Sequence, residues 1–357
     1  MAKLDAIGTI QKYDRAEMLG IIESFPKQCN AALAIGQAFD LPAAYRAKYR
    51  NIVCTGLGGS AIGSDIARSY LQGEAKIPLI VNRNYTLPAF VNSETLVIAA
   101  SYSGNTEETL SAYRDARAKG ARIIAITSGG ELGSLAEKDG CAVITIPPGL
   151  PPRCALGYSF FPLLILLSKL GIVPDKSKEI EQAISGMDAL RNNALGHHVP
   201  QRKNIAKKIA QGIFGKFPVI YGGQDRIDAV VTRWRGQIAE NAKTLASNHV
   251  FPEMNHNEIV GWEYPPKVLK SCVVLMLRDA DDSRAVSRRM DITGKILKNQ
   301  GVKVIEVQSQ GKGLLARIFS LVYTGDFVSF YLAILNRCDP TPVERIAYLK
   351  KELAKRA

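Results

Sequence analysis

The stretch NIVCTGLGGSAIGSD, residues 51–65, begins as an apolar run, passes through three closely spaced glycines and continues as a helix-like segment. Apolar and β-branched residues favour a buried strand. Gly56 and Gly58 fill the first two places of the GxGxxG pattern, and Ala61 stands in the third, which that pattern tolerates. The stretch therefore predicts a strand, a glycine turn and a helix whose N-terminus can face an anion.

Apolar runs of the same kind recur through the first half of the chain, and helix-like segments such as EETLSAYRDARAKG separate them. These runs occupy residues 77–83, 95–101, 121–128 and 141–147. Short apolar strands that alternate with helices form parallel sheets covered on both faces. The expected fold class is therefore α/β, with a doubly wound, flavodoxin-like parallel sheet.

The second half of the chain shows the alternation less clearly. Strands are predicted at 216–223, 271–279 and 302–309, and helices at 226–246, 283–300 and 313–337. We therefore expect two doubly wound subdomains with helical extensions at both ends of the chain. The predicted division is 1–46 for N-terminal helices, 47–190 for the first α/β domain, 191–338 for the second and 339–357 for a C-terminal helix.

The chain has 357 residues and a formal net charge of +13, which favours the attraction of anions. Its basic residues are spread out and have no aromatic-rich basic motif beside them, so we expect small anionic ligands and no nucleic acid. The N-terminus lacks the apolar core of a signal peptide, and the longest apolar run, FFPLLILL (160–167), is too short to cross a bilayer. We expect a cytoplasmic protein with no membrane partner.

We expect neither a metal nor a cofactor. The six cysteines are scattered without a CxxC pair, and the chain has four histidines, so the spacing typical of a zinc site is missing. Several cysteines stand in apolar strands and are expected to be buried thiols. A nicotinamide cofactor calls for an acidic residue after the second strand, but that strand ends in LIVNRNY.

A second polar loop, SYSGNTEET (101–109), follows the predicted third strand. Its Ser101, Ser103 and Thr106 can converge with Gly59 and Ser60 of the glycine turn, because both loops leave the carboxyl edge of one sheet. One alternative is structural: Ser103 or the neighbouring asparagine at 105 could cap the next helix. Two hydroxyl-rich loops without a lysine favour a sugar monophosphate over ATP.

These two loops together resemble the SIS (sugar isomerase) domain, which binds phosphorylated sugars through them. Three further stretches resemble the bifunctional phosphoglucose/phosphomannose isomerases, so that the resemblance covers nearly the whole chain. They are PPRCALGYSF (151–160), RWRGQIAENAKTLASNHVFPEMNHNEIVGW (233–262) and DPTPVERIAYLKKEL (339–353). The resemblance implies a metal-independent isomerase that interconverts glucose 6-phosphate, or mannose 6-phosphate, with fructose 6-phosphate through a cis-enediol.

Aldose–ketose isomerisation needs a base that moves a proton between C1 and C2 and a cation that stabilises the enediolate. By the resemblance, Glu240 is that base and Arg153 that cation. His256 and Lys350 open the sugar ring, and His256 comes from the neighbouring subunit of a homodimer. His249 is interpreted as a structural residue of an NHVFP turn.

One position departs from the family. Related isomerases carry a polar residue about two helical turns before the lysine, where it helps to hold a catalytic water. Val343 stands at that place, and Thr341 is the nearest hydroxyl. The lysine itself is Lys350 or its neighbour Lys351, with Lys350 favoured.

Two other functions use the same domain. A glucosamine 6-phosphate isomerase module of an amidotransferase would need an N-terminal glutaminase domain with a nucleophilic cysteine. A sugar-phosphate-sensing regulator would need a helix-turn-helix domain, and the first 46 residues lack a basic recognition helix.

Overall fold

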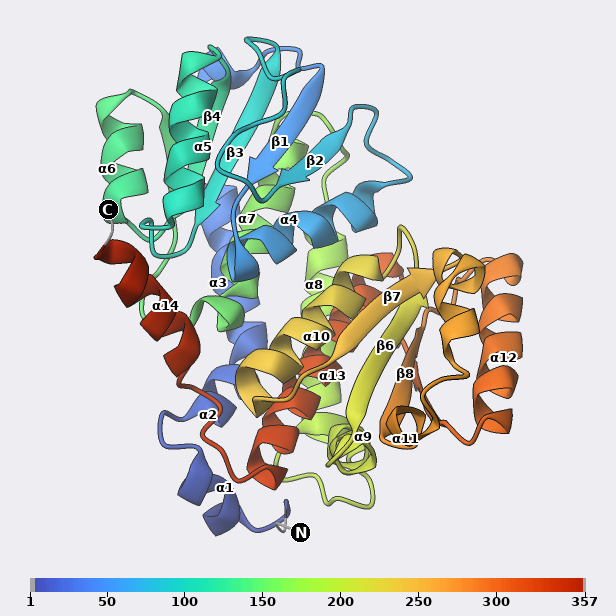
Figure 1. Cartoon of the computed structure of the whole chain (residues 1–357). Coiled ribbons are helices and arrows are strands. Elements are labelled where there is room, and N and C mark those ends of the chain that lie inside the picture. Colours follow the sequence, from blue (N-terminus) through green and yellow to red (C-terminus); the bar gives the residue numbers. More distant parts are fainter. Residues whose placement is uncertain (1–3, 356–357) are drawn as a thin grey trace.

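The computed structural model describes residues 4–355, which form two parallel sheets with a layer of helices between them (Figure 1). The first sheet has the order β2-β1-β3-β4-β5, the arrangement of a flavodoxin-like fold. Its strands are β1 (Asn51–Thr55), β2 (Leu79–Asn82), β3 (Thr95–Ser101), β4 (Arg122–Thr127) and β5 (Ala142–Thr145).

The second sheet repeats this connectivity with one strand fewer, in the order β7-β6-β8-β9. Its strands are β6 (Phe217–Gly223), β7 (Ser247–Phe251), β8 (Cys272–Arg278) and β9 (Lys303–Gln308). The expected α/β class with two doubly wound subdomains is confirmed. All eight predicted strands are present to within two residues at either end. The ninth strand, β7, was missed.

The prediction for the NHVFP stretch was wrong. Residues Ser247–Phe251 form the edge strand β7, which pairs in parallel with β6, and His249 lies within this strand. The first four residues of β7 are only half-buried, because an edge strand is covered on one side. Its sequence therefore lacks the continuous apolar run that revealed the other strands.

Helices cover both faces of each sheet. In the first half they are α1 (Ile7–Tyr13), α2 (Met18–Glu23), α3 (Phe25–Ala38), α4 (Gly58–Leu71), α5 (Glu107–Ala118), α6 (Gly130–Lys138), α7 (Leu156–Lys169) and α8 (Ser177–Leu190). In the second half they are α9 (Ile205–Ile213), α10 (Asp228–Ala242), α11 (Pro266–Leu269), α12 (Arg284–Asn299), α13 (Leu314–Leu335) and α14 (Glu344–Ala354). Short helical turns are η1 (Ala43–Tyr45), η2 (Pro152–Cys154), η3 (Arg191–Leu195), η4 (Glu253–His256) and η5 (Glu258–Gly261).

Alternating residues of each strand enter different cores, as the two-residue repeat of a strand requires. Ile52 and Cys54 of β1 belong to the large core that also contains the helices between the sheets, whereas Val53 packs on the side of α5 and α6. In the second sheet, Val273 and Leu275 face the same large core, whereas Val274 and Met276 pack with residues of α12. One continuous core therefore joins the two halves.

Helix α13 fills the centre of that core. By length and composition it could cross a membrane, but all its residues from Leu315 to Leu335 are buried within the protein. It packs closely on α10 at Gly325, where a Cβ atom would lie 2.4 Å from Nε1 of Trp234. The helix is therefore the central core element of the fold.

Candidate active site

The glycine turn after β1 places the start of α4 against the loop that carries Arg153. Helix α4 begins at Gly58, which has a positive φ of 50°. A Cβ atom on Gly59 would lie 2.4 Å from the carbonyl oxygen of Pro152, so this position has room only for glycine. The helix N-terminus, where the partial positive charge of the helix dipole lies, is thus held beside η2.

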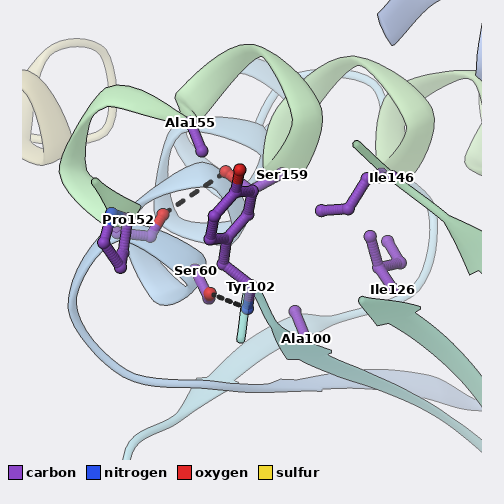
Figure 2. A pocket seen from close by; sticks show the side chains of 9 residues that line it. Ser60, Ala100, Tyr102, Ile126, Ile146, Pro152, Ala155 and Ser159 are labelled. Carbon is purple, nitrogen blue, oxygen red and sulfur yellow. Dashed lines mark hydrogen bonds between the residues drawn. The ribbon is translucent and has the colours of Figure 1, made fainter. Parts of the chain in front are cut away.

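The polar loop after β3 meets this turn, as predicted. The backbone N–H of Tyr102 donates to Oγ of Ser60 at 3.1 Å, a contact drawn in Figure 2. The hydroxyl groups of Ser101 and Thr106 lie 2.9 Å apart. A cavity of about 10 Å³ is lined by Gly59, Ser60 and Tyr102. A space of that size holds at most one water, so a phosphate would have to bind on the solvent side of the loops.

The structural alternative for this loop was wrong. Thr106 is the N-cap residue of α5 and makes no capping bond with its side chain. Oγ of Ser103 accepts from the N–H of Asn105 at 3.3 Å, and Oδ1 of Asn105 accepts from the N–H of Glu131 at the start of α6. Ser103 is exposed, so its hydroxyl faces solvent beside the start of α5.

Arg153 is buried, with only 5% of its side chain exposed, and residues from distant parts of the chain hold it in place. Its Nε donates to Oδ1 of Asn241 at 2.6 Å. Its Nη2 donates to the carbonyl oxygens of Pro340 and Thr341, both at 2.8 Å. These bonds fix the guanidinium, and the remaining nitrogen, Nη1, lies 3.5 Å from Oε2 of Glu240.

Glu240 lies in the last turn of α10 and borders a groove of about 720 Å³. Its side chain is 34% exposed. The groove is lined by α10, by the segment before α14 and by the first turn of α14. Its volume is within the range of small-molecule sites. Glu240 lines it, and the guanidinium of Arg153 lies 3.5 Å from the carboxylate of Glu240.

A buried polar row on α10 supports this pair. Arg233 donates to both carboxylate oxygens of Asp326 at 2.8 and 3.0 Å, and Gln237 donates to Oδ1 of Asp326 at 2.7 Å. Asn241, which holds Arg153, donates to Oγ of Ser329 at 3.0 Å. Sequence reasoning missed these residues. Their positions, four residues apart on one helix face, are the signal that could have revealed them.

The segment before α14 contributes a hydroxyl group without a partner. Oγ1 of Thr341 is buried and forms no hydrogen bond with any part of the chain that the structure describes. Nearby, the ammonium group of Lys243 donates to the carbonyl oxygens of Glu240 and Pro340. Partial burial lowers the pKa of Lys243 below its ordinary value. Val343 is the N-cap residue of α14 and also lines the groove.

His256 does not lie beside Glu240 of its own chain. Helix α10 runs antiparallel to β7, so Glu240 lies near the beginning of β7, whereas His256 follows its end in η4 (Figure 1). The five residues of β7 span about 16 Å, which separates the edge of the sheet beside Glu240 from the edge that carries η4. His256 is exposed, and so is Lys350, which lies one turn beyond Ile346 of the groove.

Two family models match the chain: the SIS domain over residues 46–149, and the bacterial phospho-glucose isomerase C-terminal SIS domain over residues 202–353. A bifunctional phosphoglucose/phosphomannose isomerase of Caldicellulosiruptor bescii is 49% identical, over 94% of this chain and 99% of that protein. The proteins of the same name from Aquifex aeolicus and Thermoplasma acidophilum are 40% and 37% identical, over 87% and 86% of this chain and 92% and 90% of theirs.

Solved structures show the same fold. A hypothetical protein of Thermus thermophilus matches with a TM-score of 0.72 at 16% identity, over 95% of this chain and 90% of that chain. Tagatose-6-phosphate ketose/aldose isomerase of Escherichia coli matches with a TM-score of 0.67 at 16% identity, over 91% and 95%. Fold and loops thus define a protein built of two SIS domains. The chain belongs to the family of bifunctional phosphoglucose/phosphomannose isomerases, as its resemblance to that family predicted.

Proposed function

We propose that the protein interconverts glucose 6-phosphate and mannose 6-phosphate with fructose 6-phosphate. The observation that carries this proposal is the pair formed by Glu240, which lines the groove, and Arg153, 3.5 Å away. Pro152, next to Arg153, packs on Gly59 of the glycine turn. The relatives described above are named for phosphoglucose and phosphomannose. An aldose–ketose isomerase needs a base, a cation and an anchor for phosphate, and the chain offers a candidate for each.

In this proposal the sugar phosphate is bound by the two loops. The start of α4 offers the backbone N–H of Gly59 and the hydroxyl of Ser60, and Ser101, Ser103 and Thr106 offer hydroxyls around the start of α5. A helix N-terminus favours an anion through its free N–H groups and its dipole. The phosphate then anchors the end of the substrate that does not react.

Glu240 removes the proton from C2 of the open-chain aldose and returns it to C1. The negative charge that develops on the oxygen of the enediolate faces Nη1 of Arg153, which needs no rearrangement because the other guanidinium nitrogens are already bonded. Glucose 6-phosphate and mannose 6-phosphate are epimers at C2 and share one enediol. A single base and cation can therefore serve both sugars.

We propose that Thr341 takes the role of the polar residue that Val343 does not offer. Its buried hydroxyl lacks a partner among residues 4–355, and its own carbonyl oxygen accepts from Arg153. A buried hydroxyl without a partner is destabilising. A bound water or a substrate hydroxyl would supply the missing bond next to the reacting carbons.

Ring opening is assigned to Lys350 and to His256 of a second subunit in a homodimer. Two exposed apolar surfaces support such a dimer. The groove surface comprises Leu245, Ile346, Tyr348, Leu349 and Leu353, and the histidine surface comprises Val260, Tyr264 and Val268. Tyr348 is 68% and Tyr264 is 76% exposed, which is unusual for residues of this size outside an interface.

A two-fold axis would place the histidine surface of each subunit on the groove surface of the other, so that the same contact forms twice in the dimer. His256 would thereby reach the groove of its neighbour. We also propose that the boundaries between the parts of the chain fall after residues 46, 190 and 338. We further propose that the protein is cytoplasmic. All six cysteines are free, which is typical of proteins in a reducing compartment.

The test is turnover of fructose 6-phosphate by purified protein in the presence of EDTA, followed by a coupled assay for glucose 6-phosphate and a separate assay for mannose 6-phosphate. We expect both products at rates well above a protein-free control, since no step assigned above uses a metal. Absence of both products would refute the proposed function. Loss of activity with EDTA and its return with a divalent cation, while circular dichroism shows that the protein stays folded, would refute the metal-independent mechanism alone.

A further inference from the structure

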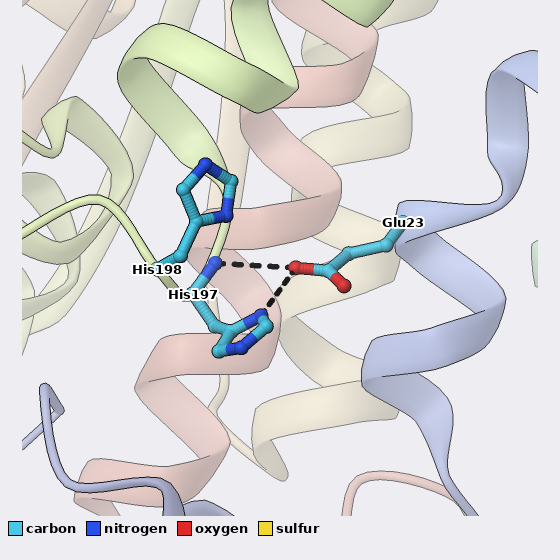
Figure 3. A group of neighbouring side chains, drawn as sticks. All are labelled: Glu23, His197 and His198. Carbon is cyan, nitrogen blue, oxygen red and sulfur yellow. Dashed lines mark hydrogen bonds and ion pairs between the residues drawn. The ribbon is translucent and has the colours of Figure 1, made fainter.

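Glu23, His197 and His198 form a compact cluster (Figure 3). Each of the three side chains offers one atom with a lone pair, and these atoms all lie within 4.8 Å of one another. It is the one such group of three or more His, Cys, Asp or Glu residues within the described part of the chain. None of the three lines the groove beside Glu240.

The hydrogen bonds of the two imidazoles orient them for a cation. Nε2 of His198 lies 3.0 Å from the carbonyl oxygen of Asn192, which can only accept, so Nε2 carries the hydrogen and Nδ1 keeps a lone pair. Donation of one ring N–H to a backbone carbonyl is the usual second contact of a metal-binding histidine. Nδ1 of His197 lies 2.7 Å from Oε1 of Glu23, so a proton sits between these two atoms where a cation could replace it.

The backbone that carries the histidines is fixed in place. The fully buried side chains of Asn204 and Lys207 donate to carbonyl oxygens of Leu195, Gly196, His197 and Val199. At Gly196 a Cβ atom would lie 2.7 Å from Cε1 of the His198 ring, so only glycine lets that ring fold back toward Glu23. The site would need only side-chain rotations, because two ligands of a tetrahedral ion stand about 3.3 Å apart.

We propose that Glu23, His197 and His198 bind one transition-metal ion of the Zn²⁺ type. Two imidazole nitrogens and one carboxylate oxygen suit Zn²⁺ and its neighbours in the first row, whereas Mg²⁺ and Ca²⁺ prefer oxygen ligands. Three protein ligands leave one tetrahedral position for water. The ion would tie the end of α2 to the segment between the two sheets, where Arg191 already donates to the carbonyl oxygen of Glu23 at 3.0 Å.

This site was not expected from the sequence. The expectation of no metal rested on scattered cysteines and few histidines. Glu23 stands 174 residues before His197, and no local spacing links them. The proposed ion is structural and takes no part in the isomerisation, so this inference stands or falls independently of the proposed function.

The experiment uses the full chain without a histidine tag, freed of metal by EDTA and then dialysed. Zn²⁺ binding is measured by equilibrium dialysis, and Co²⁺ is added separately to read the coordination from its visible absorption. We expect one ion per chain and a rise in melting temperature with Zn²⁺. In His198→Ala the affinity should fall about 10-fold or more, since loss of even an outer partner of a metal weakens binding about 10–100-fold.

The matched control is His249→Ala, which removes a histidine outside the cluster and should bind like the original protein. Circular dichroism checks that each variant is folded. Glu23→Gln serves as the second variant, because an amide can still accept from the N–H of His197 but loses the charge. Binding that is absent in the original protein, or equally tight in His198→Ala and Glu23→Gln, would overturn the proposal.

Discussion

Arg153 shows how one residue can organise a site from remote parts of a chain. Three of its five N–H groups are used by Asn241, Pro340 and Thr341, so the guanidinium cannot rotate away from Glu240. Lysine at this position could not make these bonds in the same plane. The sequence indicated the importance of Arg153, but its partners lie 88 and 187 residues further on, beyond any local pattern.

Replacement of Glu240 by glutamine tests the assignment of the base. The amide has nearly the same shape but cannot take a proton, so kcat should fall by about 10²–10⁴ while KM changes little. Steady-state kinetics with fructose 6-phosphate give both constants. Glu344→Gln is the control, because Glu344 lines the same groove without touching Arg153. Normal turnover by Glu240→Gln would show that another group is the base.

Replacement of Thr341 by valine tests the proposed water or substrate contact. Valine keeps the shape and removes the buried hydroxyl that has no partner among the described residues. We expect kcat/KM to fall by about 10-fold or more, because a lost hydrogen bond at a reacting centre is worth about 1–3 kcal/mol. Folding stability should stay the same or rise slightly.

Thr341→Ser serves as the comparison for this prediction, since it keeps the hydroxyl and removes a methyl group. It should retain most of the activity. Equal kinetics for the valine variant and the original protein would mean that Thr341 does not contact the reacting groups. Urea unfolding of all three proteins separates this outcome from simple destabilisation.

At the scale of elements, the strands could be predicted because most of them are buried on both faces and form continuous apolar runs. Edge strand β7 was not predicted, because its residues Ser247, Asn248 and His249 are polar and half-exposed. The two loops of the first sheet could be predicted because parallel strands end at one edge. The packing of η2 on α4 could not, since it depends on a contact between Gly59 and Pro152 that no pattern records.

Gly59→Ala tests that contact. The new methyl group would lie 2.4 Å from the carbonyl oxygen of Pro152, so α4 or η2 must shift. We expect a loss of about 1–3 kcal/mol in the free energy of unfolding, as is typical of overpacking, and a raised KM for fructose 6-phosphate. Urea unfolding and steady-state kinetics provide the two measurements.

Gly133→Ala is the matched control for this change. Gly133 lies in α6, and a methyl group there would have only an ordinary contact of 3.6 Å with Thr127. Alanine favours a helix over glycine, so this variant should be as stable as the original protein or more so. If Gly59→Ala behaved in the same way, the close contact between α4 and η2 would not limit the site.

At the scale of the whole molecule, the separation of Glu240 from His256 predicts complementation between inactive variants. Glu240→Gln and His256→Ala should each be nearly inactive. Co-expressed, they should form mixed dimers with one complete site, because one subunit supplies glutamate and the other histidine. Random pairing makes half of the dimers mixed, so activity should recover to about a quarter of the original.

The measurement is the specific activity of the mixed sample after purification, with its mass in solution determined by light scattering. Each variant alone, treated in the same way, is the control. No recovery from a sample shown to contain mixed dimers would place His256 in the site of its own chain or outside the reaction. A monomer with full activity would contradict the shared site altogether.

The burial of α13 has a consequence for synthesis of the chain on the ribosome. Proteins fold from the N-terminus as they emerge, at a rate set by translation. Here Leu315–Leu335 pack on α8, α9 and α10 within the layer between the sheets, and the hydroxyl of Tyr323 donates to the carbonyl oxygen of Ile22. The sides of α8, α9 and α10 that meet α13 stay uncovered until this segment arrives. The nascent chain therefore carries an open apolar surface until residues 315–335 have emerged.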